Sequence, residues 1–241
     1  LNWEKFNNEE LMQIVPLIHS FKKENLKNQM FIEPFLGSGS LFLNVDKFDN
    51  FIINDTNIQI YMLFKQIKHG HIGFIEDLKL MFCEQTNNKD FFTEEVKKYN
   101  SSNDYYKKCL SLIYLNKHSF NNMIRFNQSG KFNSSFVKNK TPYFPEKEII
   151  EMNKKLNMGE VQIFNHSFER IFDNLEYADV IYCNPPQNYQ KDDSLDFDYE
   201  KHKLLNELAF TASLKGSIVL IYNNYNEIRK ELYKDCAEYY I

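Results

Sequence analysis

Two prolines directly after an asparagine end one apolar segment of the chain. Asn184, Pro185 and Pro186 follow the run 179–183. Because proline fixes φ and has no N–H, the Asn184 side chain and the Pro185 carbonyl can be held rigidly toward one point. Two neighbouring acceptors suit an exocyclic amino group such as adenine N6, which attacks an electrophilic methyl better when both of its hydrogens are held. A strand terminator with an Asn-Pro turn is the alternative interpretation.

A second candidate is the segment EPFLGSGS, residues 33–40, which follows a short apolar run. Its glycines, Gly37 and Gly39, allow the backbone to approach a ligand closely at the start of a helix. Asp55, after the next apolar run, can accept hydrogen bonds from ribose hydroxyls. Phe42 replaces the third glycine of a dinucleotide fingerprint. The pattern therefore favours a nucleoside ligand other than a dinucleotide, with an ordinary tight turn as the alternative.

Apolar runs and helical periodicity predict the elements that position these candidates. Short apolar runs predict strands at 30–32, 51–53, 161–164, 179–183 and 217–221. Apolar residues three and four apart predict helices at 8–21 (interrupted by Pro16), 41–45, 58–67, 74–82, 91–99, 105–114, 145–158 and 201–214. Strand and helix alternate at both ends of the chain, so we expect an α/β fold with a mainly parallel sheet.

The segment between Lys68 and Lys140 differs in character from the rest of the chain. Charge-rich helical stretches precede a polar stretch, and no predicted strand of the sheet falls within it. Residues 128–131 (QSGK) lie between 124–126 and 132–133 and have the turn chemistry of a hairpin. We interpret this segment as a subdomain inserted into the α/β fold.

Composition narrows the class of protein. The chain has 241 residues and a formal net charge of -4, which excludes a uniformly basic protein that coats a polyanion. No apolar run approaches the length of about 18 residues needed to cross a membrane, and no basic-then-apolar leader is present. We therefore expect a cytoplasmic protein without a membrane span.

The cysteines and histidines do not have metal-ligand spacing. The four cysteines are widely separated and are expected to be reduced, buried thiols: Cys83, Cys109, Cys183 and Cys236. Three histidines of the α/β and inserted segments are expected to be solvated or partly buried: His118, His166 and His202. No metal is expected.

Six segments together resemble the DNA adenine-N6 methyltransferases of the Dam type, or D12 class, found in bacteria and phages. They are EPFLGSGSLFLN, IINDTN, NKHSFNNMIRFNQSGKFN, TPYFPEKEI, VIYCNPPQ and LIYNNYNEI. They span about Phe31 to Ile228 and occur in the order of the family. The number of spaced matches identifies the chain as a member of this family.

The resemblance implies a Rossmann-like S-adenosylmethionine-dependent methyltransferase fold, with methyltransferase parts at 1–67 and 146–241. The insertion at 68–145 would recognise double-stranded DNA. The methyl donor S-adenosyl-L-methionine would be bordered by Trp3, Glu33, Pro34, Phe35, Gly37, Ser38, Gly39, Ser40, Asp55, Ser167 and Phe168. A flipped adenine would meet Asn184, Pro185, Pro186 and Gln187. DNA would be contacted by Asn122, Arg125, Asn127, Lys131, Asn133, Lys138 and Lys140.

Several positions depart from the family's pattern. Of the N-terminal Lys-Trp-x-Gly-Gly-Lys only Trp3 remains, Gln187 replaces an aromatic residue that stacks on the base, and Ser167 replaces an aspartate. Stacking is worth about 1–3 kcal/mol per base, so these changes favour one alternative: a catalytically degenerate, DNA-binding or partner-binding homologue. Methylation of a protein glutamine or of an RNA adenine is a third hypothesis, since Asn-Pro-Pro turns serve other amino and amide acceptors.

Overall fold

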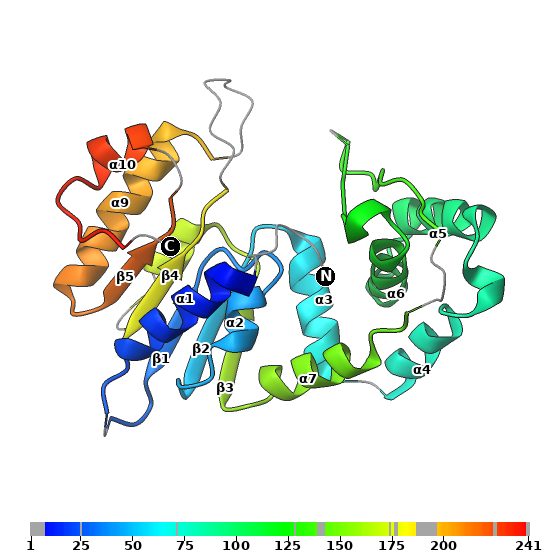
Figure 1. Cartoon of the computed structure of the whole chain (residues 1–241), viewed down its shortest axis with the longest axis horizontal. Helices are drawn as coiled ribbons and strands as arrows, with labels where there is room; N and C mark the ends of the chain where they lie inside the picture. The colour runs from blue at the N-terminus through cyan, green and yellow to red at the C-terminus, as the bar shows by residue number, and fades with distance from the viewer. Residues whose placement is uncertain are drawn as a thin grey trace. The chain divides into compact units, whose positions relative to one another are not determined.

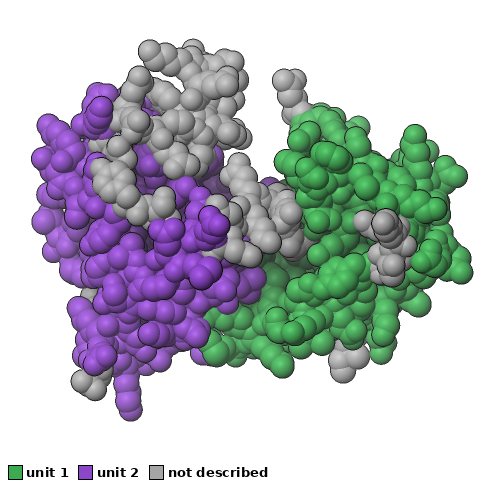
Figure 2. All heavy atoms as spheres, viewed as in Figure 1, with its two compact units in different colours: residues 1–5, 59–158 green, residues 6–58, 159–241 purple. Residues whose placement is uncertain are grey.

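The computed structural model describes residues 8–24, 26–70, 72–127, 129–138, 143–173, 175, 178–186, 197–223 and 226–239. The chain divides into two compact units, shown in Figure 2. Unit 1 contains the described residues between Gln59 and Met158, and unit 2 contains those on either side, up to Ile58 and from Gly159. Each unit is described by itself. Three predicted site residues lie outside the described residues: Trp3, Lys140 and Gln187.

Unit 2 contains a five-stranded sheet in which every pairing is parallel. The strands are β1 (Met30–Glu33), β2 (Asn50–Asn54), β3 (Glu160–Phe164), β4 (Val180–Cys183) and β5 (Ile218–Ile221). Their order across the sheet is β3-β2-β1-β4-β5 (Figure 1). Since all strands run the same way, their carboxyl ends meet at one edge of the sheet, where β1 lies between β2 and β4.

Helices of unit 2 pack on both faces of this sheet. On one face, α1 (Asn8–Ser20) packs against α2 (Ser40–Asn44), and Phe42 of α2 lies 5.4 Å from Phe51 of β2 between ring centroids. On the other face, α8 (Phe168–Asp173) and α9 (Tyr199–Leu214) share a buried cluster with Ile32 and Ile181. A short helix, α10 (Asn226–Leu232), packs on α9. Consecutive strand residues face opposite sides, so both faces of β1 are buried.

Unit 1 is mostly helical. Its helices are α3 (Ile58–His69), which begins at the unit boundary, α4 (Ile72–Leu80), α5 (Lys89–Ser101), α6 (Tyr105–Lys117) and α7 (Glu146–Leu156). Two short 3-10 turns, η1 (Glu84–Thr86) and η2 (Phe120–Asn122), flank α5 and α6. Tyr114 of α6 is fully buried against Phe91 and Phe92, and its hydroxyl donates to the Thr86 carbonyl at 2.6 Å. This unit therefore has an aromatic core of its own.

Side-chain caps explain where several helices begin. Asn88 accepts from the Phe91 N–H at the start of α5, and Asp104 accepts from the Lys107 N–H at the start of α6. Such caps satisfy backbone donors that have no partner within the helix.

The predicted strands and helices are confirmed, except that α1 continues through Pro16. Periodicity did not predict α8 and α10, because one or two turns are too short to show it.

Candidate active site

The two predicted motifs leave neighbouring strands of the sheet. The glycine segment follows β1 and the diproline corner follows β4, and these strands are paired with Ile32 opposite Ile181. The chain passes from β1 to β2 on one side, whereas β4 lies on the other side of β1. Such a reversal of strand order is the usual ligand position in open parallel sheets, beyond the carboxyl ends of the strands. The topology therefore brings both motifs to the same edge of the sheet.

The glycine turn requires glycine for its backbone conformation. Gly37 and Gly39 have φ of 53° and 71°, a left-handed region that other residues rarely adopt. A Cβ atom at Gly37 would meet no other atom within 4 Å, so the backbone conformation rather than crowding favours glycine there. The Gly39 carbonyl accepts from the Leu43 N–H at 3.0 Å, and Gly39 precedes α2. The Gly39 N–H donates to the Leu36 carbonyl at 2.8 Å, so the turn is closed by its own backbone just before α2.

Asp55 follows β2 and holds this turn. Its Oδ2 accepts from the Gly37 N–H and its Oδ1 from the Asn57 N–H, both at 2.8 Å. Burial raises the pKa of the Asp55 carboxyl group, and the two N–H groups oppose the rise. Each carboxylate oxygen offers a second lone pair. Asp55 can therefore hold the turn and also accept hydrogen bonds from ligand hydroxyls.

Glu33 is enclosed at the carboxyl end of β1. It is 1% exposed, the Phe42 N–H donates to its carboxyl group, and its Oε2 has no hydrogen-bond partner within the described chain. Burial raises the pKa of Glu33 well above its ordinary value, and the nearby Asp55 adds to the rise. A buried carboxyl group of this kind is neutral or faces a cation.

We expect Glu33→Gln to change how stability depends on pH. The raised pKa means that folded Glu33 keeps its proton where the unfolded residue has lost it, so the folded state is penalised as pH rises from about 4.5 through the folded pKa. The free energy of unfolding of the wild type should therefore fall over this window relative to the glutamine variant. Urea unfolding of both proteins between pH 4 and pH 8 measures the difference. A difference in unfolding free energy between the two proteins that does not change with pH would contradict a raised pKa for Glu33.

The diproline corner is anchored by its own strand. All four residues of β4 are buried, Asn184 is half-buried, Pro185 is buried and Pro186 is exposed. The buried strand therefore fixes the backbone just before Asn184. Asn184 lies at the boundary between the buried strand and the exposed residues that follow it. Gln187, the next predicted residue, is outside the described chain.

Aromatic rings join the loop after β1 to the one after β3. Phe35 lies 5.4 Å from Phe168 and 5.5 Å from Phe197 between ring centroids, and Phe168 is buried. Ser167, just before Phe168, is exposed. Phe197 belongs to no recognisable sequence motif, because its contact with Phe35 depends on the fold and has no local pattern.

The predicted DNA-contacting residues of unit 1 lie on one irregular loop between α6 and α7. Phe126 and Phe132 form an antiparallel bridge, as do Ser119 and Phe136, so the predicted hairpin is confirmed in outline. The predicted DNA contacts that the structure describes are all exposed: Asn122, Arg125, Asn127, Lys131, Asn133 and Lys138. Phe120 is also exposed, at 58%.

Internal hydrogen bonds hold this loop in shape. The Ser134 hydroxyl donates to the Met123 carbonyl at 2.8 Å and accepts from the Arg125 N–H at 3.0 Å. The Asn127 Oδ1 accepts from the Ser129 N–H, the Ser129 hydroxyl and the Lys131 N–H. Its acceptor oxygen is therefore occupied within the turn. Arg125 keeps its guanidinium exposed beside the Met123 sulfur.

The histidines correct one expectation. His118 and His202 are fully buried rather than solvated or partly buried. Each packs on an aromatic ring, Tyr114 for His118 and Phe197 for His202, and burial lowers the pKa of both. Within the described ranges, no group of three or more His, Cys, Asp or Glu residues could hold a metal ion.

The expectation that all four cysteines are buried is partly wrong. All four are free, but Cys236 is exposed and Cys83 is half-buried, so the expectation of buried thiols is right only for Cys109 and Cys183.

No helix in the described part of the chain is both long and apolar enough to cross a membrane.

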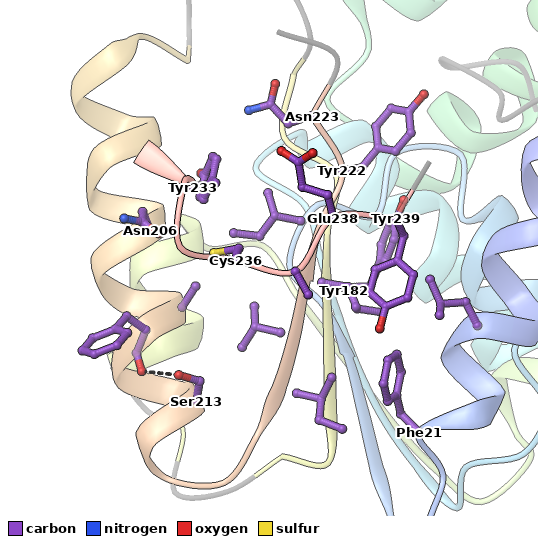
Figure 3. A pocket seen from close by; sticks show the side chains of 18 of the residues that line it. Phe21, Tyr182, Asn206, Ser213, Tyr222, Asn223, Tyr233, Cys236, Glu238 and Tyr239 are labelled. Atoms are coloured by element: carbon purple, nitrogen blue, oxygen red, sulfur yellow. Dashed lines mark hydrogen bonds between the residues drawn. The ribbon is translucent and has the colours of Figure 1, made fainter. Parts of the chain in front are cut away.

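A cavity of about 500 Å³ lies beside β5, the edge strand of the sheet. Figure 3 shows Tyr182, Tyr222 and Tyr239 on its wall, together with side chains from α1 and α9. None of the residues predicted to bind the donor, the target base or DNA is among its described lining. The described lining of this cavity therefore does not overlap with the predicted site residues.

The parallel sheet, the glycine turn after β1 and the acidic residue after β2 together define the Rossmann-like methyltransferase fold. The model of the D12 class N6 adenine-specific DNA methyltransferase family matches residues 9–241. The chain belongs to this family, and the predicted family, fold class and enzyme class are confirmed.

Its relatives include DNA adenine methylases from three bacteria. The Serratia marcescens protein is 30% identical over 234 residues, which cover 94% of this chain and 86% of the relative. The Escherichia coli K12 protein is 28% identical over 226 residues, covering 91% and 80%. The Haemophilus influenzae protein is 30% identical over 216 residues, covering 86% and 74%.

Proposed function

We propose that this protein transfers the methyl group of S-adenosyl-L-methionine to N6 of an adenine flipped out of double-stranded DNA. The donor would bind the loop 33–40, Asp55 and the segment 167–168, and the target amino group would bind at 184–187. One observation carries the proposal: the glycine turn and the diproline corner leave adjacent parallel strands at the reversal of strand order.

The residues of the donor site fit the proposed donor. S-Adenosylmethionine carries a cationic ammonium and sulfonium and two ribose hydroxyls. Glu33 offers a buried carboxyl oxygen without a partner in the described structure, and Asp55 retains unused lone pairs. A cation beside Glu33 would favour the ionised carboxylate and so lower the raised pKa of that residue. Trp3 remains a proposed contact on the basis of its place in the family's pattern.

Asn184 and Pro185 would act on the target base. When bound, the donor supplies a methyl group on a positively charged sulfur. The Asn184 Oδ1 and the Pro185 carbonyl would each accept one hydrogen of the adenine amino group. This contact draws the nitrogen lone pair out of conjugation with the ring and stabilises the developing positive charge. The proline rings keep both acceptors in place, because neither backbone φ can change.

Labelled donor tests this function. Purified protein would be incubated with S-adenosylmethionine labelled in its methyl group and, separately, with double-stranded DNA, RNA and a protein extract. We expect label in DNA, recovered after digestion as N6-methyldeoxyadenosine. Label that appears only in RNA or protein would reject the proposed substrate, and an absence of donor binding at millimolar concentration would reject the donor site.

The exposed loop between α6 and α7 would supply the DNA contacts. We propose that Arg125 and the amide groups of Asn122, Asn127 and Asn133 reach bases or phosphates, and that Lys131, Lys138 and Lys140 attract the DNA backbone. Exposure of Phe120 supports this role, since an exposed aromatic ring can stack on bases. We assign target recognition to residues 68–145, which lie within unit 1.

Lys131→Ala is expected to weaken DNA binding by a similar factor on every sequence. Removing one phosphate contact should reduce the slope of log K against log salt concentration by about 1. Fluorescence anisotropy with labelled duplexes at several salt concentrations measures this slope. Lys147→Ala is the matched control, because Lys147 is an exposed lysine on α7 outside the loop. An equal slope for wild type and Lys131→Ala would remove Lys131 from the interface.

A further inference from the structure

Asn54, the last residue of β2, joins the two loops on either side of its strand. It is 0% exposed, and its Nδ2 donates to the Pro34 carbonyl at 2.9 Å and to the His166 carbonyl at 3.0 Å. Its Oδ1 accepts from the His166 N–H at 2.9 Å. A single buried amide therefore bridges the loop after β1 and the loop after β3, which are far apart in the sequence.

The main chain strengthens the same bridge. The Asn54 carbonyl accepts from the Leu36 N–H at 2.9 Å, and the next residue, Asp55, accepts from Gly37 through its carboxylate. On the other side, the Asn165 side chain donates to the Asp55 carbonyl at 2.7 Å. The end of β2 thus holds the glycine turn on one side and the segment before Ser167 on the other.

The chemistry of this position is specific to asparagine. The surroundings present two carbonyl acceptors and one N–H donor, and a primary amide offers two donors and one acceptor at the required reach. Aspartate has the same shape but would place an oxygen against two carbonyl oxygens. An apolar residue would remove the partner of three backbone groups, the Pro34 carbonyl in a buried hydrogen bond and the His166 carbonyl and N–H in partly buried ones, which costs stability.

We propose that Asn54 is a positioning residue for the methyl donor. By fixing the loop at 34–37 relative to the loop at 166–168, it sets the spacing between the two groups of residues that would border the donor. Phe35 lies in the first loop and Phe168 begins α8 directly after the second, and their ring centroids are 5.4 Å apart. Asn54 itself would not contact the donor. This inference rests on the donor site proposed above.

Isothermal titration with S-adenosylmethionine tests the proposal with Asn54→Asp. We expect the donor dissociation constant to rise at least tenfold, while the affinity for duplex DNA stays within twofold of the wild type. The KM for the donor should rise more than kcat falls. A residue with a merely structural role would lower the unfolding temperature without changing the donor KM at a temperature where the variant is folded.

Asn153→Asp is the matched control. The Asn153 amide also donates to two backbone carbonyls, those of Ile67 at 2.6 Å and Lys68 at 3.3 Å, but all three residues belong to unit 1. The same electrostatic clash there should leave the donor affinity unchanged. Donor binding by Asn54→Asp equal to that of Asn153→Asp would overturn the proposal while leaving the donor site intact. A wild-type protein that does not bind the donor would overturn the donor site itself.

Hydrogen exchange of the wild-type protein keeps the proposal testable if the variant does not fold. The N–H groups of Leu36 and His166 are hydrogen-bonded to the main chain and side chain of Asn54, respectively. Donor binding should slow the exchange of both amides together. Protection of Leu36 by the donor without protection of His166 would show that the two loops are not coupled through Asn54, and would overturn the proposal.

Discussion

Asn184→Ala is expected to lower the rate of methyl transfer by about 10²–10³-fold, the usual cost of removing one preorganised group that stabilises transition-state charge. The alanine removes one of the two acceptors proposed for the target amino group, so the nitrogen lone pair stays conjugated with the adenine ring. The donor dissociation constant should not change, because Asn184 follows β4, whereas the proposed donor contacts that the structure describes lie at the ends of β1, β2 and β3 or just after them. Single-turnover transfer with saturating donor and DNA measures the rate.

Asn184→Asp is the control for this experiment. A carboxylate oxygen is also an acceptor at the same position, so transfer by this variant should stay within about tenfold of the wild type, an order-of-magnitude allowance for the added charge. Donor titrations on both variants check that the proposed donor site is unchanged. If Asn184→Ala transferred methyl groups as fast as the wild type, Asn184 would not be one of the hydrogen-bond acceptors that bind the target amino group.

Asp55→Ala is expected to weaken donor binding by about 10–100-fold, since hydrogen bonds to charged groups are worth about 1.5–3 kcal/mol and tenfold corresponds to about 1.4 kcal/mol. Two effects combine. The proposed ribose contact is lost, and the Gly37 N–H loses the carboxylate that holds the glycine turn. Isothermal titration with S-adenosylmethionine measures the change.

Asp49→Ala serves as the comparison for Asp55→Ala. Asp49 lies just before β2, at the amino end of the same strand, and its Oδ2 accepts from the Gln29 N–H at 3.1 Å. It therefore also fastens a loop through a backbone N–H, but at the sheet edge opposite the proposed donor site. Donor affinity should be unaffected by this change. Equal loss of affinity in both variants would mean that Asp55 acts only through general stability.

Local residue patterns are enough to predict the turns and strands of this chain. The glycine turn and the diproline corner could be predicted, because a left-handed φ and a fixed φ are properties of the residues themselves. The strands were predicted for a similar reason, since buried strands of a parallel sheet are short continuous apolar runs, as in β1 and β4. Each of these signals lies within a few neighbouring residues.

The tertiary structure alone decided what these features contact. The order β3-β2-β1-β4-β5 makes β1 a neighbour of β4, although Glu33 at the end of β1 and Val180 at the start of β4 are 147 positions apart in the sequence. It also brings His166 to Asn54 and Phe197 to Phe35. Strand order and side-chain packing depend on the free energy of burying the whole core, to which distant segments contribute together. A local residue pattern does not contain this free energy, because it depends on contacts between distant segments. The hydrogen bonds from which we infer the positioning role of Asn54 therefore could not be predicted from the sequence.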